Sequence, residues 1–303
     1  MRPLFLHLDG SLDAQSNLLA MGGFRRLSAH DLGPALRLWS RPPALTALAE
    51  RLRQHVSSET PDLVFAGSGD FHHVTPMLVE RAVESRGSEG VTVVHFDNHP
   101  DWVRFSNGLH CGSWVGRAAR APGVARLITV GVCSHDLVMP ASQGADLDLI
   151  TEARVEIYPF RVQTGGGSLR LRDLSFPTME SLGEAAFTSL LTSRIETKDI
   201  YVTIDKDVLH SQDALTNWDQ GQIGLGYLER LVRAVCDGRR LIGADVVGDW
   251  SRPIYGPGAL SGLLKRGEAL MDQPLRRQPL DLIRLVNETT NLRLLHLFTE
   301  VTA

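Results

Sequence analysis

The chain alternates short apolar runs with helix-forming patterns, and this alternation restricts its fold more than any other feature. Amphipathic patterns typical of helices lie between several of the runs, for example at 44–56, 74–86 and 226–238. Strands that alternate with helices favour a parallel sheet covered by helices on both faces. The sequence therefore predicts an α/β fold with buried strands at residues 3–9, 62–68, 91–97, 125–132, 154–160, 199–205 and 241–247.

We expect one domain over residues 1–303, because no segment has the composition of a long polar linker. Residues 271–301 are predicted to form a closing helix and a final element whose type the pattern leaves open. With 43% hydrophobic residues, 22% charged residues and a net charge of −4, the composition argues against nucleic-acid and anionic-membrane partners. No apolar run is long enough to span a membrane, and the N-terminus lacks the pattern of a signal peptide. The three cysteines are widely spaced, so we expect a cytoplasmic protein with reduced thiols.

Carboxylates and imidazoles gather where two of the predicted strands end. Asp97, His99 and Asp101 occupy alternate positions at the end of one strand, and alternate side chains of an extended chain point the same way. Asp205 and Asp207 follow another strand with the same spacing. Ligands of parallel α/β sheets bind outside the carboxyl ends of the strands. Although a single Asp after a strand is usually a turn residue, these five are predicted to converge on one site.

The charge of these residues indicates metal ions. Four aspartates would repel one another strongly without cations between them, and two divalent ions would balance their charge. The segment AGSGDFHHV offers His72 or His73 as a further ligand. Coordination that is rich in carboxylates and contains no thiolate favours Mn²⁺ over a structural zinc. Two such ions, roughly 3.5–4 Å apart, could activate a shared water molecule. We therefore expect two Mn²⁺ ions per chain.

Three motifs resemble those of the ureohydrolases, the family of arginase, agmatinase and formiminoglutamase. D-N-H-P-D at 97–101 resembles D-A-H-x-D, VTIDKDVL at 202–209 resembles S-x-D-x-D, and GSGDFHH at 67–73 resembles G-G-D-H-S. The resemblance covers about residues 60–250 and implies a three-layer αβα sandwich around a mainly parallel sheet. It also implies a binuclear manganese centre that hydrolyses a C–N bond in a guanidino or similar group. Members of the family often form oligomers, so a homo-oligomer is one expectation for this chain.

The resemblance also implies roles for individual residues. Asp97 and Asp205 would each bridge both metal ions. The histidine of the third motif is open, because Phe71 occupies the family position directly after the aspartate. We favour His72 for this ligand, with His73 as the alternative. The predicted ligand set is then His72, Asp97, His99, Asp101, Asp205 and Asp207.

The loop NGLHCGSW resembles the one that carries the proton-shuttling histidine of arginase. It points to His110 as the catalytic histidine that returns a proton to the departing nitrogen. Asn107 in the same loop is a predicted substrate contact. The alternative, which we weight about equally, is that His110 is a loop histidine bonded to backbone.

Two departures from the family pattern concern the substrate. The family places a glutamate three residues after a late aspartate, where it pairs with guanidinium, but here Asp245 is followed by Gly248. A guanidinium prefers a bidentate carboxylate partner, and Asp249 could supply one only if the loop is shifted. The family stretch D-P-x-x-A-P-G is replaced by SQDALTNWDQG, whose Trp218 and Asp219 are predicted to line a different substrate pocket. A tryptophan that only covers the core is the alternative for Trp218.

The leading hypothesis is a binuclear manganese hydrolase that acts on a small molecule with a guanidino, amidine or amide-like C–N bond, other than arginine or agmatine. A deacetylase-like zinc amidohydrolase is the first alternative, since histone deacetylases share the general fold, but Asp101 and Asp207 would be superfluous there. A non-catalytic relative that keeps the metals is the second alternative, and the missing glutamate is its best support.

Overall fold

A parallel sheet of eight strands forms the centre of the computed structural model, which describes residues 1–85, 90–163, 165–256, 258–275 and 278–302. The strand order is β2-β1-β4-β12-β11-β5-β7-β8, and every neighbouring pair is parallel. The strands span Arg2–His7 (β1), Arg25–Ser28 (β2), Asp62–Phe65 (β4), Val91–Phe96 (β5), Val124–Val130 (β7), Val155–Tyr158 (β8), Asp199–Asp205 (β11) and Arg240–Val247 (β12). The parallel α/β fold predicted from the sequence is confirmed, and β2 is an edge strand that the prediction missed.

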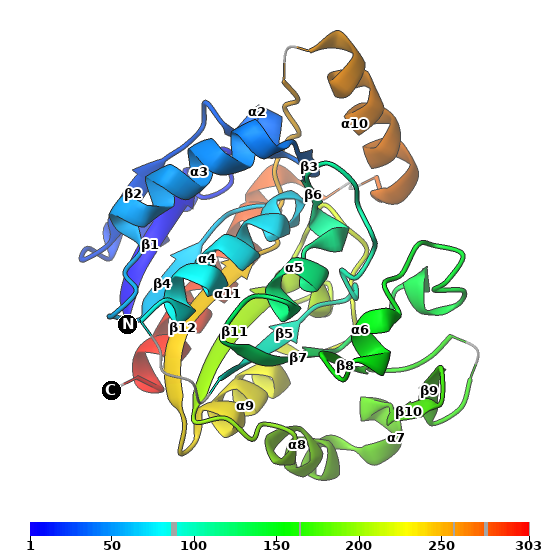
Figure 1. The fold of residues 1–303 in the computed structure, drawn as a ribbon. Coiled ribbons are helices and arrows are strands. Elements are labelled where there is room, and N and C mark those ends of the chain that lie inside the picture. The colour runs from blue at the N-terminus through cyan, green and yellow to red at the C-terminus, as the bar shows by residue number, and fades with distance from the viewer. Residues whose placement is uncertain (86–89, 164, 257, 276–277, 303) are drawn as a thin grey trace.

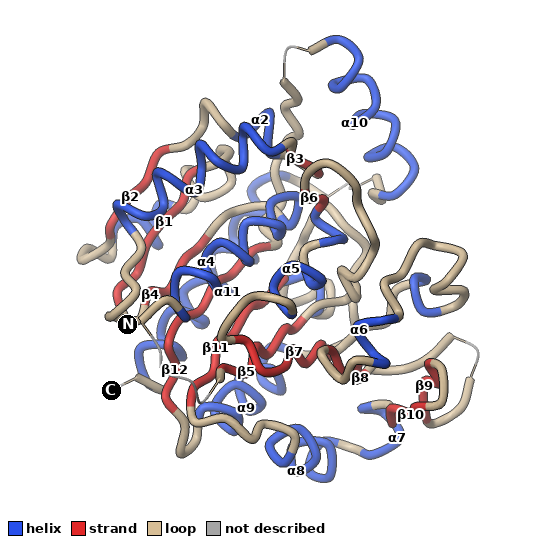
Figure 2. The backbone as a smooth tube through the Cα atoms, viewed as in Figure 1, coloured by secondary structure: helices blue, strands red, loops and turns tan. Residues whose placement is uncertain are grey.

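Helices cover both faces of this sheet, which gives the three-layer arrangement in Figure 1 and Figure 2. One layer contains α3 (Pro42–His55), α4 (Thr75–Val83) and α5 (Val115–Ala119), and the other contains α8 (Glu184–Ser193), α9 (Leu225–Cys236) and α11 (Leu280–Glu300). Helix α10 (Ala259–Asp272) lies at the periphery. It begins before the predicted closing segment, residues 271–301, and α11 forms most of that segment. Among the described helices, none combines the length and apolar character that a membrane span requires.

Shorter elements complete the chain. Two small antiparallel sheets pair β3 (Trp39–Ser40) with β6 (Leu109–His110) and β9 (Ser168–Leu171) with β10 (Leu174–Pro177). The short α-helices are α1 (Ser16–Ala20), α2 (Gly33–Leu36), α6 (Asp148–Thr151) and α7 (Met179–Leu182). The 3₁₀ helices are η1 (Gly69–Val74), η2 (Cys111–Ser113), η3 (His135–Leu137) and η4 (Lys206–Val208).

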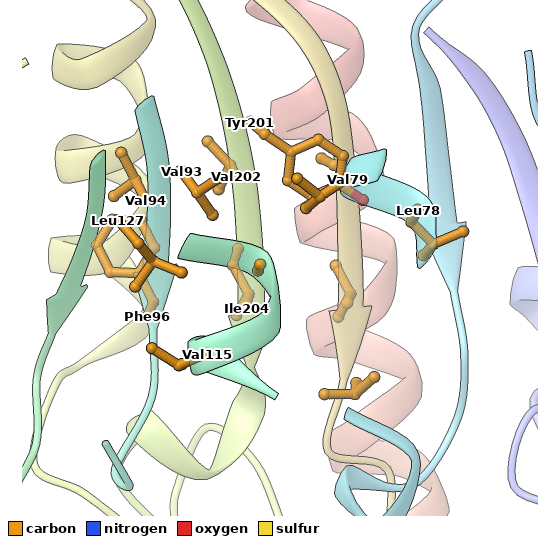
Figure 3. Packing of buried hydrophobic residues seen from close by; sticks show 14 of the residues in the cluster. Leu78, Val79, Val93, Val94, Phe96, Val115, Leu127, Tyr201, Val202 and Ile204 are labelled. Atoms are coloured by element: carbon orange, nitrogen blue, oxygen red, sulfur yellow. The ribbon is translucent and has the colours of Figure 1, made fainter. Parts of the chain in front are cut away.

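The central strands are buried on both faces. Every residue of β4, β5 and β11 is buried, as is usual for parallel strands covered by two helical layers. Val93 and Val94 of β5 are successive residues, so their side chains point to opposite faces of the sheet, and both belong to the cluster of buried hydrophobic residues drawn in Figure 3. Each fully buried side chain of this size contributes about 1.5–3 kcal/mol to the free energy of unfolding. The apolar burial therefore fixes the positions of the strand ends.

The order of the strands brings distant segments together. Strands β4, β12, β11 and β5 are neighbours in the sheet and run in the same direction. Their carboxyl ends therefore lie at one edge, which is where α/β sheets of this kind bind ligands. The residues that follow these four strands build the site described next.

Candidate metal centre

The six predicted metal ligands lie together at this edge of the sheet. His72 belongs to η1, whose start is capped by the Ser68 side chain accepting from the Asp70 N–H. Asp97, His99 and Asp101 follow β5, Asp205 is the last residue of β11, and Asp207 lies in η4 directly after it. His72, His95, Asp97 and Asp101 can place ligand atoms around one point, and Asp97, His99 and Asp207 can do so around a second. The arrangement is therefore two adjoining clusters that share Asp97.

The His72 ring is oriented for coordination through Nδ1. This nitrogen lies 3.0 Å from Asp97 Oδ2, 3.2 Å from Asp101 Oδ2 and 3.6 Å from Asp205 Oδ2, without hydrogen-bond geometry to any of them. The other nitrogen, Nε2, is 3.0 Å from the hydroxyl oxygen of Thr203, which itself donates to Asp245 Oδ1 at 2.9 Å. A hydroxyl has one proton to donate, so Thr203 accepts the Nε2 proton of His72. Nδ1 then faces the three carboxylates. Burial opposes the charged ring, but Asp101 and Asp97 raise the pKa of His72 well above its ordinary value, so Nδ1 would exchange a proton for a cation on metal binding.

The His99 ring has the same arrangement in the second cluster. Its Nδ1 lies 3.0 Å from Asp207 Oδ2 and 3.5 Å from Asp97 Oδ1. Its Nε2 is 2.8 Å from Asp219 Oδ1, so this carboxylate takes the Nε2 proton. Metal-binding histidines commonly donate their second N–H to a carboxylate in this way, which fixes the ring orientation. In each cluster, a cation between the histidine Nδ1 and the carboxylates would balance their negative charge. The six residues therefore fit a metal centre.

Burial makes the negative charge of this centre costly without cations. Burial raises the pKa of Asp205 to about 7, and the charge of Asp97 adds to the shift. Burial and the charge of Asp205 raise the pKa of Asp207 well above its ordinary value. Asp97 differs: burial opposes its ionisation, but the neighbouring imidazoles of His72 and His95 outweigh burial and hold its pKa well below the ordinary value. The centre therefore has to hold protons or cations, and its oxygen-rich donors suit a hard divalent ion.

His73 lies apart from both clusters. Its Nε2 is 2.8 Å from Ser40 Oγ, and the side chain is fully buried. Burial, together with the nearby charges of His110 and Lys265, lowers the pKa of His73 well below its ordinary value. This placement supports His72 as the ligand from the third motif and gives His73 a packing role beside β3.

Two residues around the centre were missed by the sequence reasoning. His95 donates or accepts through Nε2 at 2.8 Å from Asp97 Oδ2, and its Nδ1 lies 3.1 Å from Thr129 Oγ1. The indole of Trp114 donates to Asp101 Oδ2 at 2.5 Å. His95 continues the alternate spacing of the ligands backwards into β5, so the period was visible, but its place within an apolar strand concealed it.

A cavity of about 920 Å³ opens over the metal centre. Its walls include the ligand carboxylates, Trp218 and, from the peripheral helix α10, Glu268. His110 also lines the cavity, with Nε2 2.5 Å from Glu268 Oε1. The Gly112 N–H donates to His110 Nδ1 at 2.8 Å, so the ring proton is on Nε2, between the imidazole and Glu268. The Trp39 indole donates to the second oxygen of Glu268 at 3.0 Å.

The four predicted substrate contacts have different positions. Trp218 lines the cavity while its indole donates to Asp70 Oδ1 at 2.9 Å, and Asp219 lines it while it holds the ring of His99. Asn107 is exposed and is not among the described residues that line the cavity; its carbonyl accepts from Arg41. The structure therefore supports a place in the cavity for Trp218 and Asp219 but not for Asn107.

Asp249 also lies outside the cavity, although a shifted loop could have brought it in. It is 2% exposed and accepts from Lys206 Nζ at 2.6 Å, Gln15 Nε2 at 2.9 Å and Asn291 Nδ2 at 3.0 Å. Lys206 is buried, so its ammonium group needs this carboxylate. The expectation that Asp249 replaces the family glutamate is therefore not supported, because its charge is engaged behind the metal centre.

Gly248 has no room for a side chain. Its φ is +93°, and a Cβ atom there would lie 2.4 Å from Asp205 Oδ1 and 2.6 Å from the backbone nitrogen of Lys206. The backbone thus packs directly against a predicted bridging ligand. A side chain at residue 248 would therefore displace Asp205 or the backbone of Lys206.

We expect Gly248→Ala to weaken metal binding as well as folding. The left-handed φ alone costs about 1–3 kcal/mol of stability, and the new Cβ displaces Asp205. Gly238→Ala is the matched control, because Gly238 has a φ of +69° but nothing within 4 Å of its Cβ position. Thermal unfolding and metal titration of both variants check this. Equal metal affinity in the two would contradict the close packing of Gly248 against Asp205.

The fold and the buried carboxylate–imidazole centre define a class of α/β proteins with a metal site at the carboxyl edge of a parallel sheet. Residues 9–248 match the Arginase family, and the chain belongs to this family. The ureohydrolase resemblance of the three motifs is thereby confirmed. A comparison with curated protein sequences gives no match.

Several solved structures share the fold. Arginase from Bacillus cereus is 12% identical with a TM-score of 0.57, over 89% of this chain and 96% of that one. Formimidoylglutamase from Bacillus subtilis is 12% identical with a TM-score of 0.56, over 96% of this chain and 86% of that one. Arginase from Bacillus caldovelox is 15% identical with a TM-score of 0.55, over 89% and 97%. At these identities the likeness concerns the fold.

Proposed function

We propose that the protein is a binuclear manganese hydrolase that cleaves a C–N bond in a small molecule with a guanidino, amidine or amide-like group. One observation carries the proposal: His72 and His99 each have one ring nitrogen bonded to a protein acceptor and the other turned toward buried carboxylates. This arrangement lies at the floor of a cavity large enough for a small molecule. Proteins of similar fold are named arginase and formimidoylglutamase, which supports the same bond type here.

The geometry supports a division of the ligands into two sets. His72 and Asp101 would hold one ion, and His99 and Asp207 the other, with Asp97 between them and Asp205 beside both. Two bound divalent ions would polarise the substrate and lower the pKa of a water molecule that attacks the C–N carbon. The oxygen-rich donor set favours Mn²⁺.

The protein's own groups would manage the proton of the reaction. The nitrogen that departs from the carbon must be protonated before it leaves. The ligand carboxylates are unsuited to this, because coordination to cations keeps them deprotonated. His110 and Glu268 line the cavity and share one proton between Nε2 and Oε1, so this pair would take up the proton released by the attacking water and pass a proton to the departing nitrogen. Glu268 and the Gly112 N–H together fix the ring, so we assign Glu268 as the residue that positions His110.

The proposal is tested by metal content and turnover of the same preparation. Protein loaded with Mn²⁺ should contain two ions per chain and release ammonia, urea or an amine from at least one member of a panel of amidines, guanidines and small amides. A single tightly bound zinc ion with amide hydrolysis would instead identify the deacetylase-like alternative. Two bound ions with no turnover across the panel would identify the non-catalytic alternative.

Arginine and agmatine are expected to be poor substrates. Gly248 offers no carboxylate to a guanidinium, Asp249 is engaged by Lys206, and both oxygens of Glu268 already accept hydrogen bonds. A charge left unpaired in a desolvated site costs about 3–5 kcal/mol, so kcat/KM should fall roughly 10²–10⁴-fold below that of the preferred substrate. Urea release from both compounds measures this, and efficient release would show the inference wrong.

A further inference from the structure

Helix α10 leaves five large apolar side chains exposed, and Met271 among them also borders the cavity over the metal centre. Leu260, Leu263, Leu264, Leu270 and Met271 are 57–80% exposed, and we call these five residues the leucine stripe. Their spacing places them on one face of the helix. A helix on the surface of a monomeric protein normally directs such a face to the core. Leaving five large apolar side chains in water forgoes about 1.5–3 kcal/mol for each that could be fully buried.

The opposite face of α10 is held to the body of the protein by polar groups. Lys265 is 3% exposed and donates to the carbonyl of Ala35 at 2.9 Å. Glu268 accepts from Trp39 and contacts His110, and Gln273 just after the helix donates to Asp70 Oδ1 at 2.6 Å. Turning the helix over to bury the leucine stripe would break these interactions. The stripe therefore stays on the outside of the subunit.

The order of apolar residues along the leucine stripe is nearly symmetric about Gly267, which suits contact with a second copy of the helix. In LLKRGEALM, residues 263–271, large apolar side chains stand three and four positions before Gly267 and again three and four positions after it. An antiparallel copy of the helix that crosses at Gly267 therefore presents the same side chains at matching positions. Gly267 has nothing within 4 Å of its Cβ position, so a second backbone can approach closely there. This is the self-complementarity that a two-fold symmetric interface requires.

We propose that the leucine stripe binds a second copy of this chain, through an antiparallel pair of α10 helices that cross at Gly267. A lipid surface fits less well, because membrane-binding helices have polar faces rich in Lys and Arg. In α10, Lys265 and Arg266 are balanced by Glu268 and Asp272, and Lys265 is buried. The charges of the helix therefore provide no attraction to anionic lipid.

The size of the stripe sets the strength of the dimer. Five side chains of this kind expose roughly 100 Å² of apolar surface each, so the pair of helices buries on the order of 1,000 Å² in total. That value is at the lower end of specific protein interfaces. The dimer is therefore expected to dissociate on dilution, with a Kd of roughly micromolar order.

Sedimentation velocity over about 1–100 µM protein tests the dimer. The wild-type protein should change from monomer to dimer, and the variant with both Leu264→Glu and Leu270→Glu should stay monomeric with an unchanged circular dichroism spectrum. Leu174→Glu is the control, because Leu174 in β10 is 46% exposed but lies well away from α10 (Figure 1). A wild-type monomer at every concentration overturns the proposal and leaves the stripe to a different partner. A double variant that associates like the wild type overturns it as well.

Cysteine cross-linking tests the antiparallel register. Residues on the two-fold axis face their own copies, so Gly267→Cys should form an intermolecular disulfide on mild oxidation. Leu260→Cys should not, because residues seven positions from the crossing point lie roughly 20 Å from their copies, beyond the roughly 7 Å between Cα atoms that a disulfide allows. Efficient cross-linking of Leu260→Cys, or none of Gly267→Cys, overturns this register.

Discussion

Replacing Asp97 by alanine is expected to remove both metal ions and to abolish hydrolysis. One carboxylate oxygen of Asp97 lies 3.0 Å from His72 Nδ1 and the other 3.5 Å from His99 Nδ1, so a single side chain serves both clusters. Its loss removes a negative charge from each ion, and turnover that depends on both should fall by more than about 10⁴-fold. Elemental analysis after loading with Mn²⁺ and dialysis measures the first effect, and a substrate identified from the panel measures the second.

Asp219→Asn is the control for this experiment. Among the six predicted ligands, Asp219 forms a hydrogen bond only with the outer nitrogen of His99, while its second oxygen accepts from Asn98. Its replacement should therefore weaken one ion by roughly 10–100-fold, the usual effect of losing such a partner. The ion beside His72 should remain. If Asp97→Ala instead retains one ion at full occupancy, Asp97 does not bridge, and the two clusters are independent sites.

His110→Ala is expected to lower kcat by roughly 10²–10⁴-fold, the usual contribution of general acid–base catalysis, while both metal ions stay bound. The reason is positional: His110 lines the cavity beside the metal centre, and Gly112 and Glu268 hold its proton on Nε2. Steady-state kinetics and metal content are measured on the same preparation. Near-normal turnover would remove His110 from the mechanism, and loss of metal would make it a ligand.

Glu268→Gln tests whether Glu268 positions the Nε2 proton of His110, because this variant keeps the histidine and changes only its partner. The amide keeps the size of the side chain and can still accept from Trp39, but it is a weaker partner for the imidazole. We expect a smaller fall in kcat than for His110→Ala and a shift of the pH–rate profile, with KM nearly unchanged. A profile identical to that of the wild type would mean that Glu268 only packs against the histidine.

The ligands were predictable from the sequence because two strong regularities coincide at them. Alternate residues of a strand share a face, and the ends of parallel strands share an edge, so Asp97, His99 and Asp101 could be expected to meet Asp205 and Asp207. The edge strand β2 was missed because RRLS is short, charged and only partly buried, and lacks the apolar run that marks a central strand.

The parts of the site that sequence reasoning missed depend on contacts between distant segments. Glu268 contacts His110 across 158 residues, and nothing in the local pattern of α10 distinguishes Glu268 from Asp272, the other acid of the helix. Asp249 was predicted to contact the substrate in place of the family glutamate. In the folded chain it pairs instead with the buried ammonium group of Lys206, and this pairing could not be read from the sequence. In both cases the role of the carboxylate depends on a partner that is distant in the sequence: His110 for Glu268 and Lys206 for Asp249.

The source of Glu268 has a consequence for how this protein can change. The predicted metal ligands lie at or just beyond the carboxyl ends of the central strands, whereas the carboxylate beside His110 comes from a helix at the periphery (Figure 1). Residues 258–275 could therefore be exchanged or redesigned without rebuilding the metal site. If the proposed function holds, α10 is the segment to vary in directed evolution, because it contributes Glu268 to the cavity wall without contributing a predicted metal ligand.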